Sequence, residues 1–185
     1  AQVRALGAKQ LGGMNSLQIQ AFNKAAVASL TTDQLSAFED AQIKALSADQ
    51  VKALTSAQLN SLKDTQIASI DAADIAGISA NTIAQLSTTQ ISRLTNAQVS
   101  ALTNAQMKAL TTDQVSALSD DQIKGLEATD IAAMTTAQVR ALDANQLTQL
   151  NSLQIQALNK ATVASLTTDQ LSAFEDAQID RKSVV

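Results

Sequence analysis

Apolar and polar positions along this chain recur every eight residues. Counted from Gly7, the register holds without insertion or deletion through 22 octads, ending at Lys182. The fifth residue of the octad is apolar in all 22, and the eighth is Leu, Ile, Met or Phe in 21, with Lys182 as the exception. The fourth residue is Gln in 17 octads, and the first is Ser, Thr, Asn or Asp in 17. The consensus is [S/T/N/D]-x-x-Q-[I/V/L]-x-A-L.

Each octad carries the signals that begin a helix. The first residue suits the N-cap, and the Gln three residues later completes a capping box. The apolar residue that closes the preceding octad and the one at position five form a hydrophobic staple. In the octad 111–118, the cap is Thr111, the box partner is Gln114, and the staple joins Leu110 to Val115. The helix therefore restarts every eight residues.

The eight-residue period excludes the common alternatives. Eight helical residues advance about 800°, so apolar positions would spiral around one long helix, and a coiled coil needs a period near 3.5. Positions five, seven and eight do not alternate as a strand requires. The pattern predicts an all-α solenoid of very short capped helices, each of about six residues, one per octad. Its core is predicted to be aliphatic, with Phe22, Phe38 and Phe174 as local fillers.

A longer repeat overlies the octads. Residues 15–43 match residues 151–179 at 27 of 29 positions, an offset of 136 residues or 17 octads. We predict a single continuous solenoid over 1–182, with a long unit 1–136, the start of a second copy at 137–179, and residues 183–185 outside the repeat. Because 17 is prime, either all octads are interchangeable or one coil holds a non-integer number of them. The chain is interpreted as a segment of a larger tandem array.

Composition narrows the possible chemistry. There is no Cys and no His, which excludes thiol chemistry and histidine acid–base catalysis. The acid pairs Glu39/Asp40, Asp120/Asp121 and Glu175/Asp176 do not form a calcium-loop motif and instead suit the starts of helices. Asp74 and Asp130 replace Gln at position four and can cap in its place. We expect no catalytic, cofactor-binding or metal-binding residue, no cofactor and no enzyme activity.

Two repeated features, the Gln series and a row of basic residues, could each bind a partner. The Gln series either caps helices and joins successive coils, which we favour, or forms an exposed amide ladder for a glycan, ice or a peptide. Basic residues recur in phase at position six and predict a basic edge opposite an acidic one, with lateral or end-to-end self-association: Lys44, Lys52, Lys108, Lys124 and Arg140. The net charge of −4 argues against a nucleic-acid partner, and no apolar run is long enough for a membrane span.

The stretches LTTDQVSAL and LTNAQVSAL resemble the LTTAQ[VI]xAL-type short repeats of very large bacterial secreted or surface proteins, which are adhesin-like. The resemblance covers residues 1–179 and implies a bacterial source, an extracellular or cell-surface location and a spacer or adhesion role. We therefore expect a structural spacer or stalk segment. The alternatives are a binding scaffold for an extended glycan or peptide, and a self-assembling filament subunit.

Overall fold

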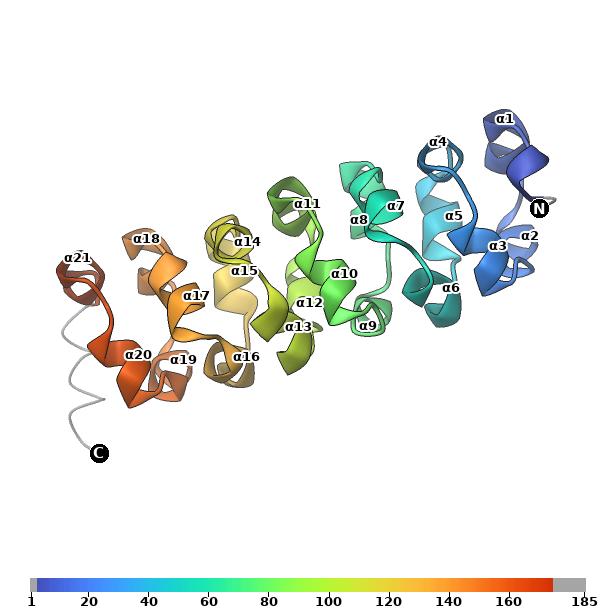
Figure 1. Cartoon of the computed structure of the whole chain (residues 1–185). Helices are drawn as coiled ribbons and strands as arrows, with labels where there is room; N and C mark the ends of the chain where they lie inside the picture. The colour runs from blue at the N-terminus through green and yellow to red at the C-terminus, as the bar shows by residue number, and fades with distance from the viewer. Residues whose placement is uncertain (1–2, 175–185) are drawn as a thin grey trace. The chain divides into compact units, whose positions relative to one another are not determined.

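A computed structural model describes residues 3–174 of the chain. Over these residues the chain is entirely helical, with no strand, as the sequence predicts (Figure 1). The elements are η1 (Val3–Ala5), α1 (Ala8–Gly12), α2 (Ser16–Gln20), α3 (Lys24–Ala28), α4 (Thr32–Ser36), α5 (Asp40–Lys44), α6 (Ala48–Lys52), α7 (Ser56–Asn60), α8 (Asp64–Ala68), α9 (Ala72–Ile75), α10 (Ala80–Ala84), α11 (Thr88–Arg93), α12 (Asn96–Ser100), α13 (Asn104–Ala109), α14 (Thr112–Ser116), α15 (Asp120–Gly125), α16 (Ala128–Ala133), α17 (Thr136–Ala141), α18 (Ala144–Thr148), α19 (Ser152–Ala157), α20 (Lys160–Ala164) and α21 (Thr168–Ser172).

The chain divides into two compact units, Ala1–Leu94 and Thr95–Val185. The first contains η1 and α1 to α11, and the second contains α12 to α21. The division falls between two octads, and a single continuous solenoid over 1–182 stays a prediction. The octad 175–182, with its acid pair Glu175/Asp176, lies outside the described residues, as do residues 183–185.

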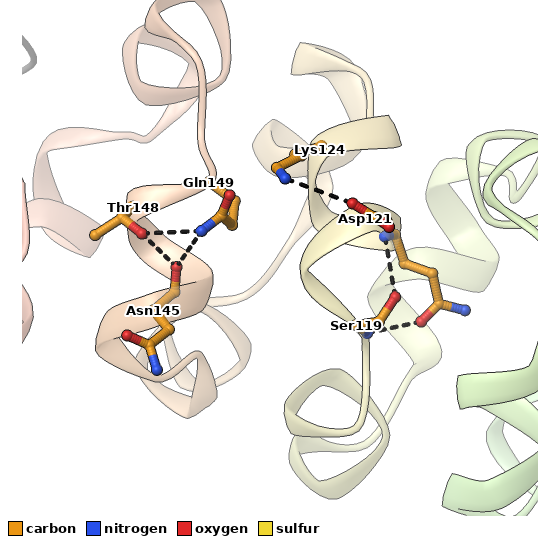
Figure 2. Close-up of polar contacts among 7 residues, drawn as sticks. Ser119, Asp121, Lys124, Asn145, Thr148 and Gln149 are labelled. Carbon is orange, nitrogen blue, oxygen red and sulfur yellow. Dashed lines mark hydrogen bonds and ion pairs between the residues drawn. The ribbon is translucent and has the colours of Figure 1, made fainter.

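The capping box that the sequence predicts begins most of these helices; α3, α9, α10, α11 and α20 lack it. At α14, Thr111 Oγ1 accepts from the Gln114 N–H at 3.1 Å, and Gln114 Oε1 accepts from the Thr111 N–H at 2.8 Å. Figure 2 shows Ser119 in the equivalent place before α15, where its N–H donates to Gln122 Oε1 at 2.8 Å. Each helix starts at the second residue of its octad and ends before the next cap, which confirms one short helix per octad within 7–174.

Within each unit, a helix packs against the helix three octads further along the chain. Examples are α2 on α5 and α5 on α8 in the first unit, and α13 on α16 and α16 on α19 in the second. Hydrogen bonds from position four reach further back, across 28 to 31 residues. Since three octads span 24 residues and four span 32, one coil holds between three and four octads. In both units, one coil therefore holds a non-integer number of octads, which was one of the two alternatives that the sequence left open.

The core of each unit is a continuous aliphatic strip. Position five is buried in every octad from Leu11 to Ile155, and position eight from Leu30 to Leu166, with no difference between odd and even octads. Of the predicted aromatic fillers, Phe38 is 2% exposed, whereas Phe22 and Phe174 are only half-buried. The latter two belong to the first and last coils of the described chain, where one side of the coil has no described neighbour.

Small residues at position seven permit close approach between coils. A Cβ at Gly125 in α15 would lie 3.4 Å from the Cβ of Asn96 and 3.5 Å from Ser100 Oγ, both in α12. These distances leave room for little more than an alanine methyl group, which matches the consensus at this position.

Candidate functional site

The glutamine at position four is the most regular polar feature of the fold. In Gln138, which is 2% exposed, Oε1 accepts from the Thr135 N–H at 2.7 Å. Its Nε2 donates to the backbone oxygens of Met107 at 2.8 Å and Leu110 at 2.7 Å. One side chain thus caps the start of its own helix and binds the carbonyl end of the helix four octads earlier. The Thr135 N–H and the Leu110 oxygen are groups that short helices otherwise leave unpaired, while the Met107 oxygen also accepts from the Leu110 N–H at 3.3 Å.

The same two-sided arrangement recurs within each unit. Gln154 accepts from the Asn151 N–H at 2.7 Å and donates to Ile123 O at 3.1 Å and Leu126 O at 2.6 Å. The other buried glutamines that show both bonds within one unit are Gln34, Gln42, Gln50, Gln58, Gln66, Gln146 and Gln170. Their side-chain amides are buried and hydrogen-bonded within the fold, which confirms the prediction that the Gln series caps helices and joins successive coils. The exposed-ladder alternative is wrong for these residues.

Gln90, in the first unit, departs from this arrangement. At Gln90, Nε2 donates to Asn60 O at 3.1 Å and Leu62 O at 2.9 Å, but Oε1 is buried without a hydrogen-bond partner. The N–H of Ser87, which would normally bind it, donates instead to Asn60 Oδ1 at 2.8 Å. Asn60 occupies position six, so a polar side chain from the earlier coil competes for the cap.

Position six also supplies a second set of inter-coil bonds, which sequence reasoning missed. Ser116 Oγ donates to Ala141 O at 2.8 Å, and Asn60 Nδ2 donates to Gln85 O at 3.1 Å. Ser100 Oγ makes the equivalent bond to Gly125 O. Each joins position six to position seven of the octad three further on. The signal in the sequence is only a recurrent Ser, with a single Asn, at a position that also holds Ala, Lys and several other residues.

Asp130 replaces glutamine in a buried setting. It is 3% exposed, and its Oδ2 accepts from the Glu127 N–H at 2.8 Å, so it caps α16 as the sequence predicts. Burial raises the pKa of Asp130, the Glu127 N–H opposes this, and the Glu127 carboxylate raises it further. Burial also raises the pKa of Asp74, helped by the charge of Asp71. An aspartate has no amide N–H to offer the preceding coil.

We expect Asp130→Gln to raise the free energy of unfolding at pH 7 by about 1–2 kcal/mol, since an added amide donor and the removal of a desolvated charge both favour the fold. Because the folded-state pKa of Asp130 is raised, its protonation favours folding, so its contribution is largest at low pH and is lost as the pH rises through that pKa. The gain should therefore shrink between pH 7 and pH 4.

Urea unfolding followed by circular dichroism at both pH values measures this difference. Asp113→Asn is the matched control, because Asp113 is an exposed acid in the same unit. The control should change stability by less than about 0.5 kcal/mol. A gain from Asp130→Gln that is equal at the two pH values would contradict the role of the buried carboxyl group.

The charged residues singled out from the sequence lie on the surface. The side chains at these positions are all exposed: Lys44, Lys52, Lys108, Lys124 and Arg140.

The acidic and polar surface residues bond mainly to near neighbours. Asp121 pairs with Lys124 at 3.4 Å within α15 (Figure 2), and Asp40 Oδ1 accepts from Thr65 Oγ1 at 2.9 Å. Figure 2 also shows Thr148 and Gln149 bonded to the backbone oxygen of Asn145, at 2.6 Å and 3.2 Å. Among residues 3–174, no three acidic side chains gather to hold a metal ion.

Short capped helices, a regular core and a repeated buried amide define the class: this is an all-α, solenoid-like structural repeat protein. The ALTTAQ repeat family matches it four times, at residues 27–64, 67–104, 99–128 and 123–160, which together cover more than half of the chain. The chain belongs to the ALTTAQ repeat family. Every match begins at position five of an octad, and the last three overlap in succession, as interchangeable octads allow.

Two further observations bear on function. No curated protein matches the chain. Of the helices in the described part, none has the length and apolar character needed to cross a membrane.

Proposed function

We propose that the chain is a spacer or stalk segment of a large tandem-repeat protein that bacteria secrete or display on their surface. The main observation that supports this proposal is that the octads are structurally equivalent. The glutamines at position four repeat the same pair of bonds in both units, and positions five and eight form the same core. A protein whose role is to span distance needs many equivalent units, whereas a ligand site or a catalytic centre needs residues that occur once.

The outer positions also favour a spacer over a binding scaffold. A scaffold for an extended glycan or peptide would repeat the same exposed side chains at positions two, three and six. At position three the chain instead places Ala, Asp, Thr, Leu and Asn without a fixed order. The proposal includes no enzyme activity and no nucleic-acid partner.

The spacer role predicts that length increases with the number of repeats. We would prepare chains with one, two and three copies of residues 1–136 and measure their maximum dimension by small-angle X-ray scattering at low protein concentration. The dimension should rise in equal steps with copy number. A dimension that rises only as the cube root of mass would show collapse into a globule and would refute the spacer.

The location can be tested separately. An antibody raised against this chain should label intact cells of the source organism, or detect the parent protein in the medium. Labelling that appears only after the cells are made permeable would overturn the surface or secreted location. The spacer role would still be tested by the scattering experiment.

A further inference from the structure

In the first unit, an asparagine makes a bond that the capping glutamine makes elsewhere. Asn60 is exposed and occupies position six, at the end of α7. Its Oδ1 accepts from the Ser87 N–H at 2.8 Å, and its Nδ2 donates to Gln85 O at 3.1 Å. Because one backbone partner is a donor and the other is an acceptor, they fix the direction in which the planar amide of Asn60 faces.

The competition leaves the amide oxygen of Gln90 unpaired. Gln90 is 6% exposed, and its Nε2 donates to Asn60 O at 3.1 Å and Leu62 O at 2.9 Å, so the side chain lies in the usual place. Its Oε1 is buried and has no hydrogen-bond partner. A buried acceptor without a donor carries the full desolvation penalty of that group, and such groups are uncommon in folded proteins.

The second unit contains the same arrangement with serine at position six, and there the glutamine is fully bonded. Ser116 Oγ donates to Ala141 O at 2.8 Å, so the carbonyl oxygen at position seven has its donor. Gln146 Nε2 donates to Ser116 O at 3.2 Å and Leu118 O at 2.6 Å. Because the serine side chain ends at its hydroxyl, the Asp143 N–H donates to Gln146 Oε1 at 2.9 Å.

The two arrangements therefore differ in one hydrogen bond. In both, the N–H of the cap residue and the oxygen at position seven have a partner. Position six ends a helix and is exposed in both, and Asn and Ser have similar helix propensities. What remains is a buried amide oxygen that is paired near Ser116 and unpaired near Asn60.

We propose that Asn60 makes the start of α11 a weak joint built into the first unit, at which α11 opens locally while the other helices stay folded. Local opening occurs where bonds are fewest, at a lower free energy than global unfolding. When α11 separates from octad 55–62, water reaches Gln90 Oε1, so opening removes a penalty that the closed joint carries. The inference does not depend on the spacer role.

Asn60→Ser tests the joint in the first unit. The new hydroxyl donates to Gln85 O, and the Ser87 N–H becomes available to Gln90 Oε1. Native-state hydrogen exchange followed by NMR should show the amides of α11 protected about tenfold more than in the wild type, with those of α5 unchanged. Asn81→Ser is the matched control, because Asn81 is exposed in α10 of the same unit, and it should leave the protection of α11 unchanged.

Ser116→Asn is the converse test in the second unit. The new amide should take the Asp143 N–H from Gln146 Oε1, so that the amides of α18 lose about tenfold in protection. In the wild type, α18 should already be about tenfold better protected than α11, because Gln146 Oε1 is paired and Gln90 Oε1 is not.

Four results would overturn the proposal. The first is a wild-type α11 that is protected as well as α18, and the second is an Asn60→Ser variant whose α11 gains no protection. The third is a Ser116→Asn variant whose α18 loses none. The fourth is a gain from Asn60→Ser that is equal in every helix of the first unit, since the unpaired oxygen would then weaken the unit as a whole.

Circular dichroism verifies that each variant is folded. If Ser116→Asn unfolds, Ser36→Asn takes its place, because Gln66 Nε2 donates to Ser36 O at 3.2 Å and Gln66 Oε1 accepts from the Lys63 N–H at 2.8 Å. The amides of α8 then report the loss. None of these outcomes changes the test of the spacer role, which is the dependence of length on copy number.

Discussion

Replacing Gln138 by Met is expected to lower the free energy of unfolding by about 3 kcal/mol, since three hydrogen bonds, two of them buried, are lost at about 1 kcal/mol each. Met has a similar length and fills the same space, so the loss reports the polar contacts and little packing. The groups left without this partner are the Thr135 N–H and the backbone oxygens of Met107 and Leu110. Urea unfolding followed by circular dichroism measures the change.

The chain provides a control for this substitution. Gln18 keeps the capping bond to the Asn15 N–H but is exposed, so Gln18→Met should cost about 1 kcal/mol. The difference between the two variants isolates the bonds to the preceding coil. Equal losses in Gln138→Met and Gln18→Met would show that the glutamines stabilise the fold by capping alone, and that the inter-coil bonds contribute nothing.

Leu147→Ala is expected to cost about 3 kcal/mol, because truncating a fully buried leucine removes transfer free energy and leaves a cavity. Leu147 is 0% exposed at position five of its octad. Each α-helix, of four to six residues, is too short to be stable alone, so its coil depends on this contact. The same urea titration measures the loss, and a lower slope would indicate that one unit unfolds before the other.

Leu153→Ala is the paired control, with the same chemistry at a surface site in the same unit. Leu153 is 68% exposed, so its truncation should change the free energy of unfolding by less than about 0.5 kcal/mol. If both substitutions cost the same, the buried strip at positions five and eight would not be what holds the coils together.

Local structure was largely predictable because its causes lie within one octad. The cap, the box and the staple are all made within nine consecutive residues, as Leu110, Thr111, Gln114 and Val115 show. Helix starts and the buried positions five and eight therefore follow from the pattern. Asp74 and Asp130 were both predicted to cap in place of Gln. Asp130 does so, but the prediction is wrong for Asp74, because α9 begins without a capping box.

The parts that were not predictable depend on how the coils stack. Nothing within an octad specifies that Gln138 binds the oxygens of Met107 and Leu110, because that pairing follows from the number of octads in a coil. Nothing within an octad specifies either that the Ser87 N–H donates to Asn60 Oδ1 instead of to Gln90 Oε1. Phe22 was expected in the core, but its environment depends on whether another coil covers it.

A coil that holds a non-integer number of octads has a consequence for how such a gene can change. A glutamine at position four binds the octad four earlier, whichever octad that is, so the in-frame gain or loss of a single octad of coding DNA shifts later helices onto equivalent partners. Replication slippage and unequal recombination can then lengthen or shorten the array one octad at a time, without disturbing the fold on either side of the change.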